Sequence, residues 1–206
     1  MYREPRTIYL IRHGKTQLPD GRRRYIGHYD APLDSAGVEQ AGCLKKRLDG
    51  ARIAAAFCSD LSRSRRTAEI IVNDKHIPIF ARQDLREIHL GEWEGCTFAD
   101  IKQRFPDEFS KRGSDIVHYR VPGGESFGDC SRRVLAAFQA ILETSTGNIL
   151  IAGHAGVNRM ILCHITGVPL QDLFKIRQEY GCINIIQENV AGLQVVMMAN
   201  NYLQIP

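Results

Sequence analysis

The chain has 206 residues, of which 44% are hydrophobic and 24% are charged, so it can bury a sizeable core beneath a soluble surface. These values exclude a mainly disordered chain and fit one α/β domain. The formal net charge is only +4. The basic residues form short clusters, whereas nucleic-acid-binding proteins more often carry a long basic stripe. Short clusters favour a small anionic ligand.

The six cysteines lie far apart and include no Cys-x-x-Cys pair, which argues against a zinc site or a dense set of disulfides. We expect free thiols in a reducing compartment. The first apolar run, Ile8–Ile11, is too short and too close to Arg12 for a signal peptide or a membrane span. We therefore expect a cytoplasmic protein with no membrane contact.

Short apolar runs alternate with amphipathic segments along the chain. The first half predicts, in chain order, a strand over Thr7–Ile11, a helix capped by Asp34 or Ser35 and ended by Gly50, a strand over Ala54–Cys58, a helix over Leu61–Val72 and a strand over Ile77–Phe80. The second half predicts helices near Phe98–Phe105 and over Ser126–Leu142, a strand over Asn148–Ala152, a helix over Val157–Ile165, and strands over Cys182–Gln187 and Leu193–Met198.

The spacing of apolar residues also predicts which face of the first helix is buried: Val38, Ala41, Leu44 and Leu48. The alternation of strands and helices predicts a three-layer α/β/α sandwich with a mostly parallel central sheet. We expect residues 1–206 to form a single domain, with an irregular insertion at about 82–122.

Two histidines follow predicted strands directly. His13 comes after Ile8–Ile11, and His154 comes after Ile149–Ala152. Ligands of open α/β sheets bind beyond the carboxyl ends of the strands. The glycine and alanine neighbours of both histidines would let a ligand approach the backbone closely. The two histidines are therefore candidates for one ligand site.

Arginines accompany these histidines. Arg12 precedes His13, and Arg63 falls in the first turn of a predicted helix, where free backbone N–H groups already favour an anion. A planar guanidinium can hold two phosphate oxygens at once. A single histidine or arginine in such a place is more often an ordinary polar residue, but four together predict a pocket for a phosphate dianion.

Five segments, in this order, resemble the motifs of the histidine phosphatase superfamily, which includes the cofactor-dependent phosphoglycerate mutases. They are Leu10–Thr16, Ser59–Arg63 with Thr67 and Ala68, Leu85–Ile88 followed by Gly91–Gly95, Pro122–Ser126, and Gly153–Gly156. The resemblance extends through nearly the whole chain. It implies the phosphoglycerate mutase-like fold and a phosphatase that forms a phosphohistidine.

The resemblance also implies roles for individual residues. His13 would be the nucleophile, and Glu87 would be the general acid and then the general base. Glu92 and Glu94 are nearby alternatives to Glu87. The residues implied to bind the phosphate or the rest of the substrate are Arg12, Gly14, Thr16, Tyr25, Gly27, Arg63, His154 and Ala155. No metal and no other cofactor is implied.

Two positions depart from the family pattern. Lys15 stands where glutamate or glutamine is common, and Pro19 stands where many members have asparagine. Lys15 could attract an acidic substrate or could simply face solvent. Pro19 puts one polar contact to phosphate in doubt, though not the transfer itself.

The substrate is expected to be a small phosphomonoester. The segments Arg24–Leu33 and Ile176–Asn184 resemble those of α-ribazole phosphatases, which implies α-ribazole 5′-phosphate and the assembly of the lower ligand of cobalamin. Tyr25 or Phe127 could stack on a base. The alternatives are a broad-specificity or phosphoserine phosphatase, a phosphoglycerate mutase, or a silent phosphate-binding module. A monomer and a homodimer both fit, since an apolar terminal strand could pair at a sheet edge.

Overall fold

The computed structural model describes residues 5–73 and 76–200. Within these ranges, six strands form one sheet in the order β3-β2-β4-β1-β5-β6. They are β1 (Arg6–Arg12), β2 (Ile53–Ser59), β3 (Ile79–Arg82), β4 (Asn148–Gly153), β5 (Ile183–Asn189) and β6 (Gly192–Ala199). Strands β3, β2, β4 and β1 run parallel to one another, whereas β5 is antiparallel to both of its neighbours, β1 and β6. The mostly parallel sheet is confirmed, with an antiparallel hairpin at one edge.

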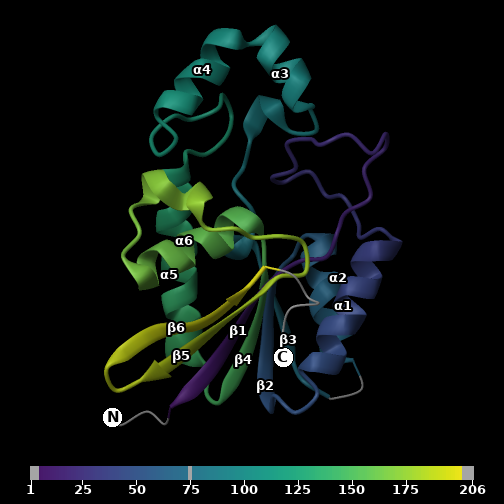
Figure 1. Ribbon diagram of the computed structural model, residues 1–206, viewed down its shortest axis with the longest axis vertical. Helices are drawn as coiled ribbons and strands as arrows, with labels where there is room; N and C mark the ends of the chain where they lie inside the picture. The colour runs from purple at the N-terminus through teal and green to yellow at the C-terminus, as the bar shows by residue number, and fades with distance from the viewer. Residues whose placement is uncertain (1–4, 74–75, 201–206) are drawn as a thin grey trace.

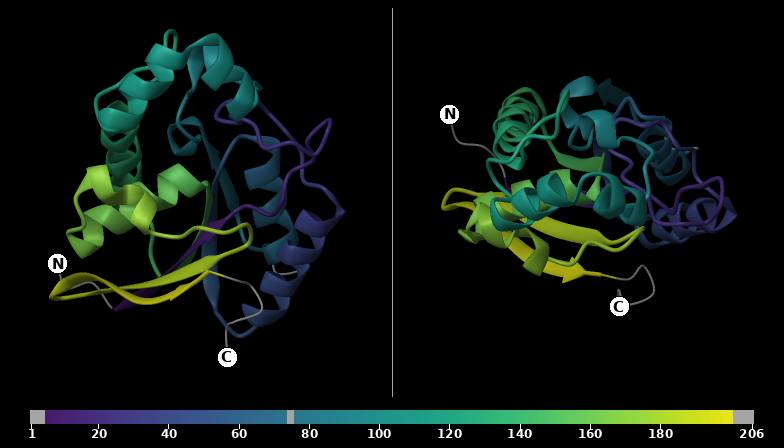
Figure 2. Two further views of the ribbon diagram at one scale, coloured as in Figure 1. Left: turned by 45° about the horizontal axis from the view of Figure 1, so that its top comes forward. Right: turned by 90° about the horizontal axis from the view of Figure 1, so that it is seen from above.

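Helices cover both faces of this sheet, as Figures 1 and 2 show. Helices α1 (Ser35–Arg47) and α2 (Ser62–Val72) pack together on one face, and α5 (Phe127–Thr144) and α6 (Ala155–Thr166) pack together on the other. Ile149 and Ile151 of β4 belong to the core under α5 and α6, while Leu150 between them belongs to the core under α1 and α2. Because side chains alternate along a strand, the central strands are buried on both faces. The predicted three-layer sandwich is confirmed.

The segment between β3 and α5 forms a lobe beyond the carboxyl ends of the parallel strands (Figure 1). It contains two 3-10 turns and two helices: η1 (Gln83–Leu85), η2 (Gly91–Trp93), α3 (Phe98–Arg104) and α4 (Pro106–Ser114). The sequence predicted α3 but not α4. The signal for α4 is Pro106 at its first position followed by Asp107 and Glu108, a common helix start. A third 3-10 turn, η3 (Leu170–Lys175), follows α6.

The first helix differs from its prediction at its end and on its buried face. Asp34 caps the start as expected, because its carboxylate accepts a hydrogen bond from the Gly37 backbone. The cap at the other end is Leu48, so the prediction of Gly50 was wrong: Leu48 is buried against the core, and the chain has already left the helix there. Val38 is 43% exposed. Gly37 is buried in its place, since its backbone packs against the loop after β1.

Two other sequence expectations concern membranes and cysteines. None of the helices in the described ranges is long and apolar enough to cross a membrane. All six cysteines are free thiols. Four of them are buried and two are half-buried.

Candidate active site

Strands β1 and β4 place the two histidines side by side. These strands are parallel neighbours with Arg12 opposite Gly153, so the next residue of each strand, His13 or His154, leaves the sheet at the same edge. The His13 backbone N–H donates to the Gly153 carbonyl at 3.1 Å. The two imidazole rings are 5.0 Å apart between centroids and inclined by 63°. The sequence prediction that both strand ends contribute to one site agrees with this geometry.

His13 is held as a neutral imidazole with one defined tautomer. Its Nδ1 lies 2.7 Å from the Gly14 carbonyl oxygen, and because a carbonyl only accepts hydrogen bonds, Nδ1 carries the proton. Nε2 is then left with its lone pair free. Burial, with smaller contributions from the guanidinium groups of Arg63 and Arg12, holds the pKa of His13 well below its usual value. His13 therefore presents an unprotonated nitrogen at neutral pH.

His154 is fully buried beside it. Its Nε2 lies 2.6 Å from the Ser59 hydroxyl at the end of β2, so a third parallel strand orients this ring. Burial is the main cause that lowers the pKa of His154 well below its usual value, and Arg63 and His13 add to it. Ser59 lies in one of the motifs that resemble the superfamily, but no local pattern in the sequence indicates a contact between Ser59 and His154.

Arg63 lies in the first turn of α2 and is fully buried. Its guanidinium donates to three backbone carbonyls of the loop after β1: Tyr29 at 2.9 Å, Ile26 at 3.1 Å and Gly27 at 2.7 Å. These bonds fix the loop against the site, so Gly27 contributes its carbonyl oxygen to Arg63. Burial lowers the pKa of Arg63 from its usual value, and the charge of Glu87 is the largest opposing influence.

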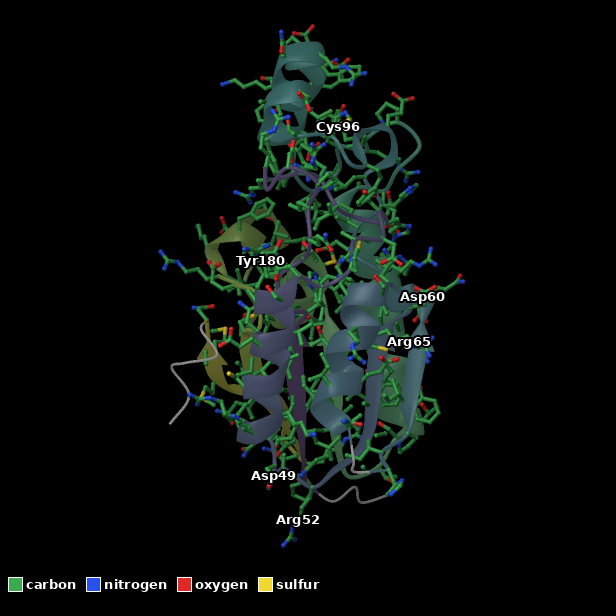
Figure 3. All side chains as sticks on the ribbon, turned by 90° about the vertical axis from the view of Figure 1, so that its right-hand side faces the viewer. Asp49, Arg52, Asp60, Arg65, Cys96 and Tyr180 are labelled. Carbon is green, nitrogen blue, oxygen red and sulfur yellow. The ribbon has the colours of Figure 1, made fainter. Side chains whose placement is uncertain are left out.

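Arg12 is positioned by Tyr180, a residue that sequence reasoning missed. The Arg12 guanidinium lies 3.7 Å from the centre of the Tyr180 ring and donates to the Gln178 carbonyl at 2.6 Å. The Tyr180 ring is also 5.6 Å from that of His13. In Figure 3, Tyr180 lies between the sheet and the lobe that carries Cys96. The segment Ile176–Asn184 resembles a late segment of α-ribazole phosphatases, and nothing in it indicates a cation–π contact.

Several buried polar atoms around His13 lack hydrogen-bond partners. In the described part of the chain, the buried side-chain atoms with no partner are Arg12 Nε, Thr16 Oγ1, His28 Nε2, Arg63 Nε and His154 Nδ1. Proteins leave few such atoms unpaired. Three of the five belong to Arg12, Arg63 and His154, whose charges or rings act directly on His13. An oxyanion bound beside His13 would supply partners for these three side chains.

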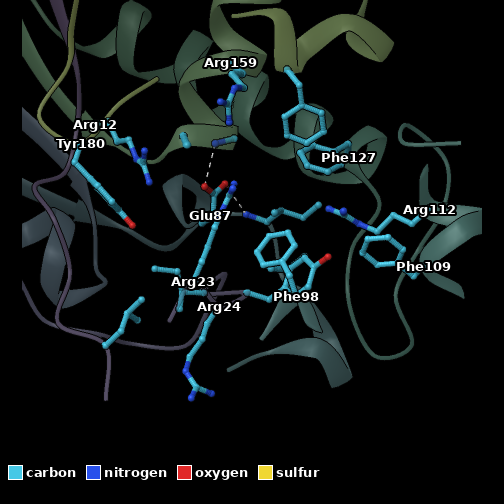
Figure 4. Close-up of a pocket in the computed structure, with 18 of the residues that line it drawn as sticks. Arg12, Arg23, Arg24, Glu87, Phe98, Phe109, Arg112, Phe127, Arg159 and Tyr180 are labelled. Carbon is cyan, nitrogen blue, oxygen red and sulfur yellow. Dashed lines mark hydrogen bonds between the residues drawn. The ribbon is translucent and has the colours of Figure 1, made fainter. Parts of the chain in front are cut away.

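Glu87 lies at the N-terminus of α6. Its Oε2 accepts from the Gly156 backbone at 3.0 Å, and its Oε1 accepts from its neighbour Ile88 at 3.0 Å, as the dashed lines in Figure 4 mark. The alternatives are placed elsewhere. Glu92 is exposed, and the carboxylate of Glu94 accepts backbone bonds from His28, Tyr29 and Leu90. Glu94 thus braces a loop, which leaves Glu87 as the carboxylate that faces the site.

A pocket of about 400 Å³ opens beside these groups. It is lined by Arg12, Leu18, Arg23, Arg24, Tyr25, Ile26, Glu87, Ile88, Leu90, Phe98, Phe109, Arg112, Gly113, Phe127, Ala155, Gly156, Arg159, Phe174 and Tyr180. In Figure 4, Arg12 and Tyr180 lie on one side of Glu87, while Phe109, Arg112 and Phe127 lie on the other. The pocket therefore has a polar end next to His13 and an aromatic end under the lobe.

Several of the residues predicted to be catalytic or to bind substrate are not among those that line this pocket: His13, Gly14, Thr16, Gly27, Arg63 and His154. Gly14 donates its backbone N–H to the Thr67 hydroxyl at 3.2 Å, and a Cβ on Gly14 would come within 2.4 Å of the Gly37 carbonyl oxygen. Gly14 therefore has a packing role here. Thr16 is buried, and its backbone forms an isolated antiparallel β-bridge with Leu33, while its hydroxyl has no partner. Tyr25 and Ala155 do line the pocket.

The two departures from the family pattern also lie outside the pocket. Lys15 is exposed, and its ammonium group is 3.4 Å from the Asp34 carboxylate. Of its two suggested roles, this placement agrees with a solvent-facing side chain. Pro19 is exposed in the loop after β1.

Comparison with known proteins identifies the family. The model described as "Histidine phosphatase superfamily (branch 1)" matches residues 8–201. The chain belongs to the histidine phosphatase superfamily. It is therefore a phosphatase that acts on small phosphate esters.

Individual relatives of this phosphatase agree with that assignment. Adenosylcobalamin/alpha-ribazole phosphatase of Escherichia coli K12 is 32% identical over 184 residues, which cover 88% of this chain and 90% of the relative. A solved structure of a putative alpha-ribazole-5′-P phosphatase from E. coli has a TM-score of 0.87 at 30% identity, covering 94% of this chain and 96% of the other. The 6-phosphofructo-2-kinase/fructose-2,6-bisphosphatase of Caenorhabditis elegans is 32% identical over 174 residues, which cover 82% of this chain but 36% of the relative.

The position of Glu87 in this phosphatase depends on the absence of a side chain at Gly156. A Cβ there would come within 2.4 Å of Glu87 Oε1. We expect Gly156→Ala to displace the carboxylate and to lower kcat/KM by about tenfold to a hundredfold, with little change in Tm because the fold need not shift. Steady-state kinetics and thermal unfolding check this result. Gly42→Ala in α1, where a Cβ meets nothing within 4 Å, is the matched control. Unchanged kinetics in Gly156→Ala would contradict the role of this contact.

The two buried histidines should make the stability of the phosphatase depend on pH. Their folded-state pKa values lie well below that of an unfolded chain, about 6.5. Below pH 6.5 the unfolded state therefore binds protons that the native state does not, and the free energy of unfolding falls as the pH drops. We expect a loss of about 1 kcal/mol per histidine between pH 7.5 and 5.5. Urea titrations of wild type and His13→Asn should show a smaller loss in the variant, and an identical loss would contradict the shift.

Proposed function

We propose that this phosphatase transfers the phosphoryl group of its substrate to Nε2 of His13 and then to water. The observation that carries the proposal is the bond between His13 Nδ1 and the Gly14 carbonyl at 2.7 Å, which leaves Nε2 as a free base in a neutral ring. A neutral imidazole is available at pH 7 and forms a phosphoramidate that water can attack. The positive charges of Arg12 and Arg63 act on this ring.

In the first step, the bond between Nε2 and phosphorus forms as the ester oxygen leaves. Arg12, Arg63 and His154 stabilise the negative charge on the non-bridging oxygens, using the buried atoms that have no other partner. Glu87 protonates the leaving alkoxide and becomes a carboxylate. The backbone N–H groups of Gly156 and Ile88 stabilise that carboxylate.

In the second step, water attacks the phosphorus and gives its proton to Glu87. The nitrogen–phosphorus bond breaks, and its electron pair returns to Nε2 of His13. Inorganic phosphate leaves, and both residues are back in their starting states. One carboxyl group thus serves as acid and then as base, which requires that Glu87 stay on the leaving-group side of the pocket.

Arg12 and Arg63 hold the positive charge that a metal ion supplies in other phosphatases. We therefore expect turnover of p-nitrophenyl phosphate to survive incubation with EDTA and extensive dialysis. The measurement is the initial rate before and after chelation. Loss of all activity, restored by adding back a divalent metal ion, would contradict this step of the proposal.

For the substrate, we propose α-ribazole 5′-phosphate in the assembly of the lower ligand of cobalamin. Relatives named as α-ribazole phosphatases cover nearly the whole chain at 28–32% identity. The aromatic end of the pocket can receive a base, which a plain sugar phosphate lacks. The test is kcat/KM for α-ribazole 5′-phosphate, phosphoserine, 3-phosphoglycerate and fructose 2,6-bisphosphate. We expect the highest value for α-ribazole 5′-phosphate, and faster turnover of phosphoserine would overturn the assignment.

The other candidate functions have less support. A silent phosphate-binding module would be expected to have lost the nucleophile, an arginine or the acid, yet the chain keeps His13, Arg12, Arg63 and Glu87. Arg12 and Glu87 line the pocket, and the charges of Arg12 and Arg63 act on His13. A mutase needs its phosphohistidine protected from water. No observation in the described residues favours such protection over hydrolysis.

A further inference from the structure

Arg112 is a half-buried cation that the proposed reaction does not use. It comes from the last turn of α4 and lines the aromatic end of the pocket. Its guanidinium carbon lies 5.3 Å from the ring centre of Phe127, 5.7 Å from that of Tyr25 and 5.8 Å from that of Trp93. Among the described residues, no carboxylate acts on Arg112, and burial lowers its pKa from the usual value.

A role in the fold alone does not account for this placement. A cation in the last turn of a helix interacts favourably with the helix dipole, but it does so equally well in solvent. Burying the guanidinium costs free energy, and the surrounding rings offset that cost only in part. The partial burial of Arg112 at the wall of the pocket is explained if its guanidinium contacts the ligand that the pocket binds.

The surroundings of Arg112 indicate the chemistry of that ligand. The walls next to it are rings: Tyr25 stacks on Phe98 with 4.1 Å between centroids, and Phe109 and Phe127 line the same end. Ring faces carry partial negative charge, so they disfavour an anion beside them. A planar nitrogen heterocycle fits both the rings and the guanidinium. Its face can stack on either group, and a nitrogen at its edge can accept a hydrogen bond from a guanidinium N–H.

The position of this end of the pocket also fits a base. Figure 4 shows Arg112, Phe109 and Phe127 on the far side of Glu87 from Arg12. Because Glu87 protonates the leaving oxygen, whatever lies beyond it contacts the leaving group and not the phosphate. A base attached through a sugar to the ester oxygen would reach this place.

We infer that Arg112, with Tyr25, Phe98, Phe109 and Phe127, forms a base subsite that binds the planar nitrogen heterocycle of a nucleoside 5′-phosphate. This inference rests on the proposed function and deepens it: the subsite selects nucleoside monophosphates over sugar phosphates. Arg112 comes from α4, so the lobe between β3 and α5 supplies specificity, while the ends of the strands supply the reaction.

The test is a selectivity ratio, kcat/KM for α-ribazole 5′-phosphate divided by kcat/KM for ribose 5-phosphate. The two esters share the sugar and phosphate and differ in the base. We expect Arg112→Met to lower this ratio about tenfold, mainly through KM for the nucleotide. The control is Arg104→Met in α3, since Arg104 also stacks on a ring, that of Phe105, but is exposed and outside the pocket. The control should leave the ratio unchanged.

Further outcomes separate this inference from the proposed function. If wild type prefers adenosine 5′-phosphate to ribose 5-phosphate and Arg112→Met removes the preference, the subsite stands even if α-ribazole 5′-phosphate is a poor substrate. The subsite is overturned if the selectivity ratio of Arg112→Met stays within twofold of the wild-type ratio. It is also overturned if wild type prefers no base-bearing ester to ribose 5-phosphate. If Arg112→Met instead lowers kcat/KM for fructose 1,6-bisphosphate but not for fructose 6-phosphate, Arg112 binds an anion and the subsite is overturned. Because each result is a ratio within one variant, partial misfolding does not mimic it.

Discussion

Replacement of His13 by alanine is expected to lower kcat by about four orders of magnitude or more, the scale seen when a covalent nucleophile is removed. The remaining arginines can still bind phosphate, but no neighbouring group presents a free nitrogen lone pair at the same place. The nearest ring, His154, is oriented by Ser59 and lies 5.0 Å away between centroids. Rates with p-nitrophenyl phosphate under saturating conditions measure the effect.

The control for this loss is His164→Ala, which removes an exposed histidine of α6. It should retain wild-type activity. Binding of inorganic phosphate or vanadate to His13→Ala should persist, because Arg12 and Arg63 remain. Equal turnover in wild type and His13→Ala would contradict the nucleophilic role. A fall in Tm together with the loss of turnover would show that the variant had misfolded.

Replacement of Glu87 by glutamine should lower kcat by about a hundredfold to ten-thousandfold with an alkyl phosphate. The amide cannot donate a catalytic proton or take one from water. It can still fill the same space, but it keeps one accepting oxygen in place of the two that accept from Gly156 and Ile88 in the carboxylate. Steady-state rates with α-ribazole 5′-phosphate or phosphoserine measure the loss.

The leaving group provides a sharper form of this test. p-Nitrophenolate leaves without protonation, so the first step with p-nitrophenyl phosphate should be much less sensitive to Glu87→Gln than the same step with an alkyl ester. Release of p-nitrophenol should then show a burst followed by slow turnover, since the second step still lacks its base. The matched control is Glu92→Gln, an exposed carboxylate of η2 that should have no effect. An equal loss with both substrates would contradict the acid role.

Residues next to strand ends could be predicted from the sequence. Short apolar runs place His13 and His154 directly after strands, and the rule that carboxyl ends of parallel strands share an edge brings them together. The position of Arg63 near the site could be predicted as well, because Arg63 lies in the first turn of the helix that follows the strand ending at Ser59. The order of the strands was not predicted, because it depends on long-range pairing and not on local pattern.

Residues whose roles depend on tertiary packing could not be predicted. Tyr180 and Arg112 reach the pocket from segments far from the motifs, and a cation–π contact leaves no spacing signal in the sequence. The buried face of α1 was shifted for a similar reason: Gly37 packs on the loop after β1, which exposes Val38. The cytoplasmic location and the choice between monomer and homodimer stay predictions.

The most direct test of the account is a rapid-quench experiment with p-nitrophenyl phosphate labelled in its phosphate group, using wild type and Glu87→Gln. The account predicts a phosphoenzyme that is stable in base and labile in acid, as a phosphoramidate is. The label should map to the peptide containing His13, accumulate in Glu87→Gln, and be absent from His13→Ala. Phosphate release without any labelled enzyme, or a label on a residue other than His13, would contradict the central claim.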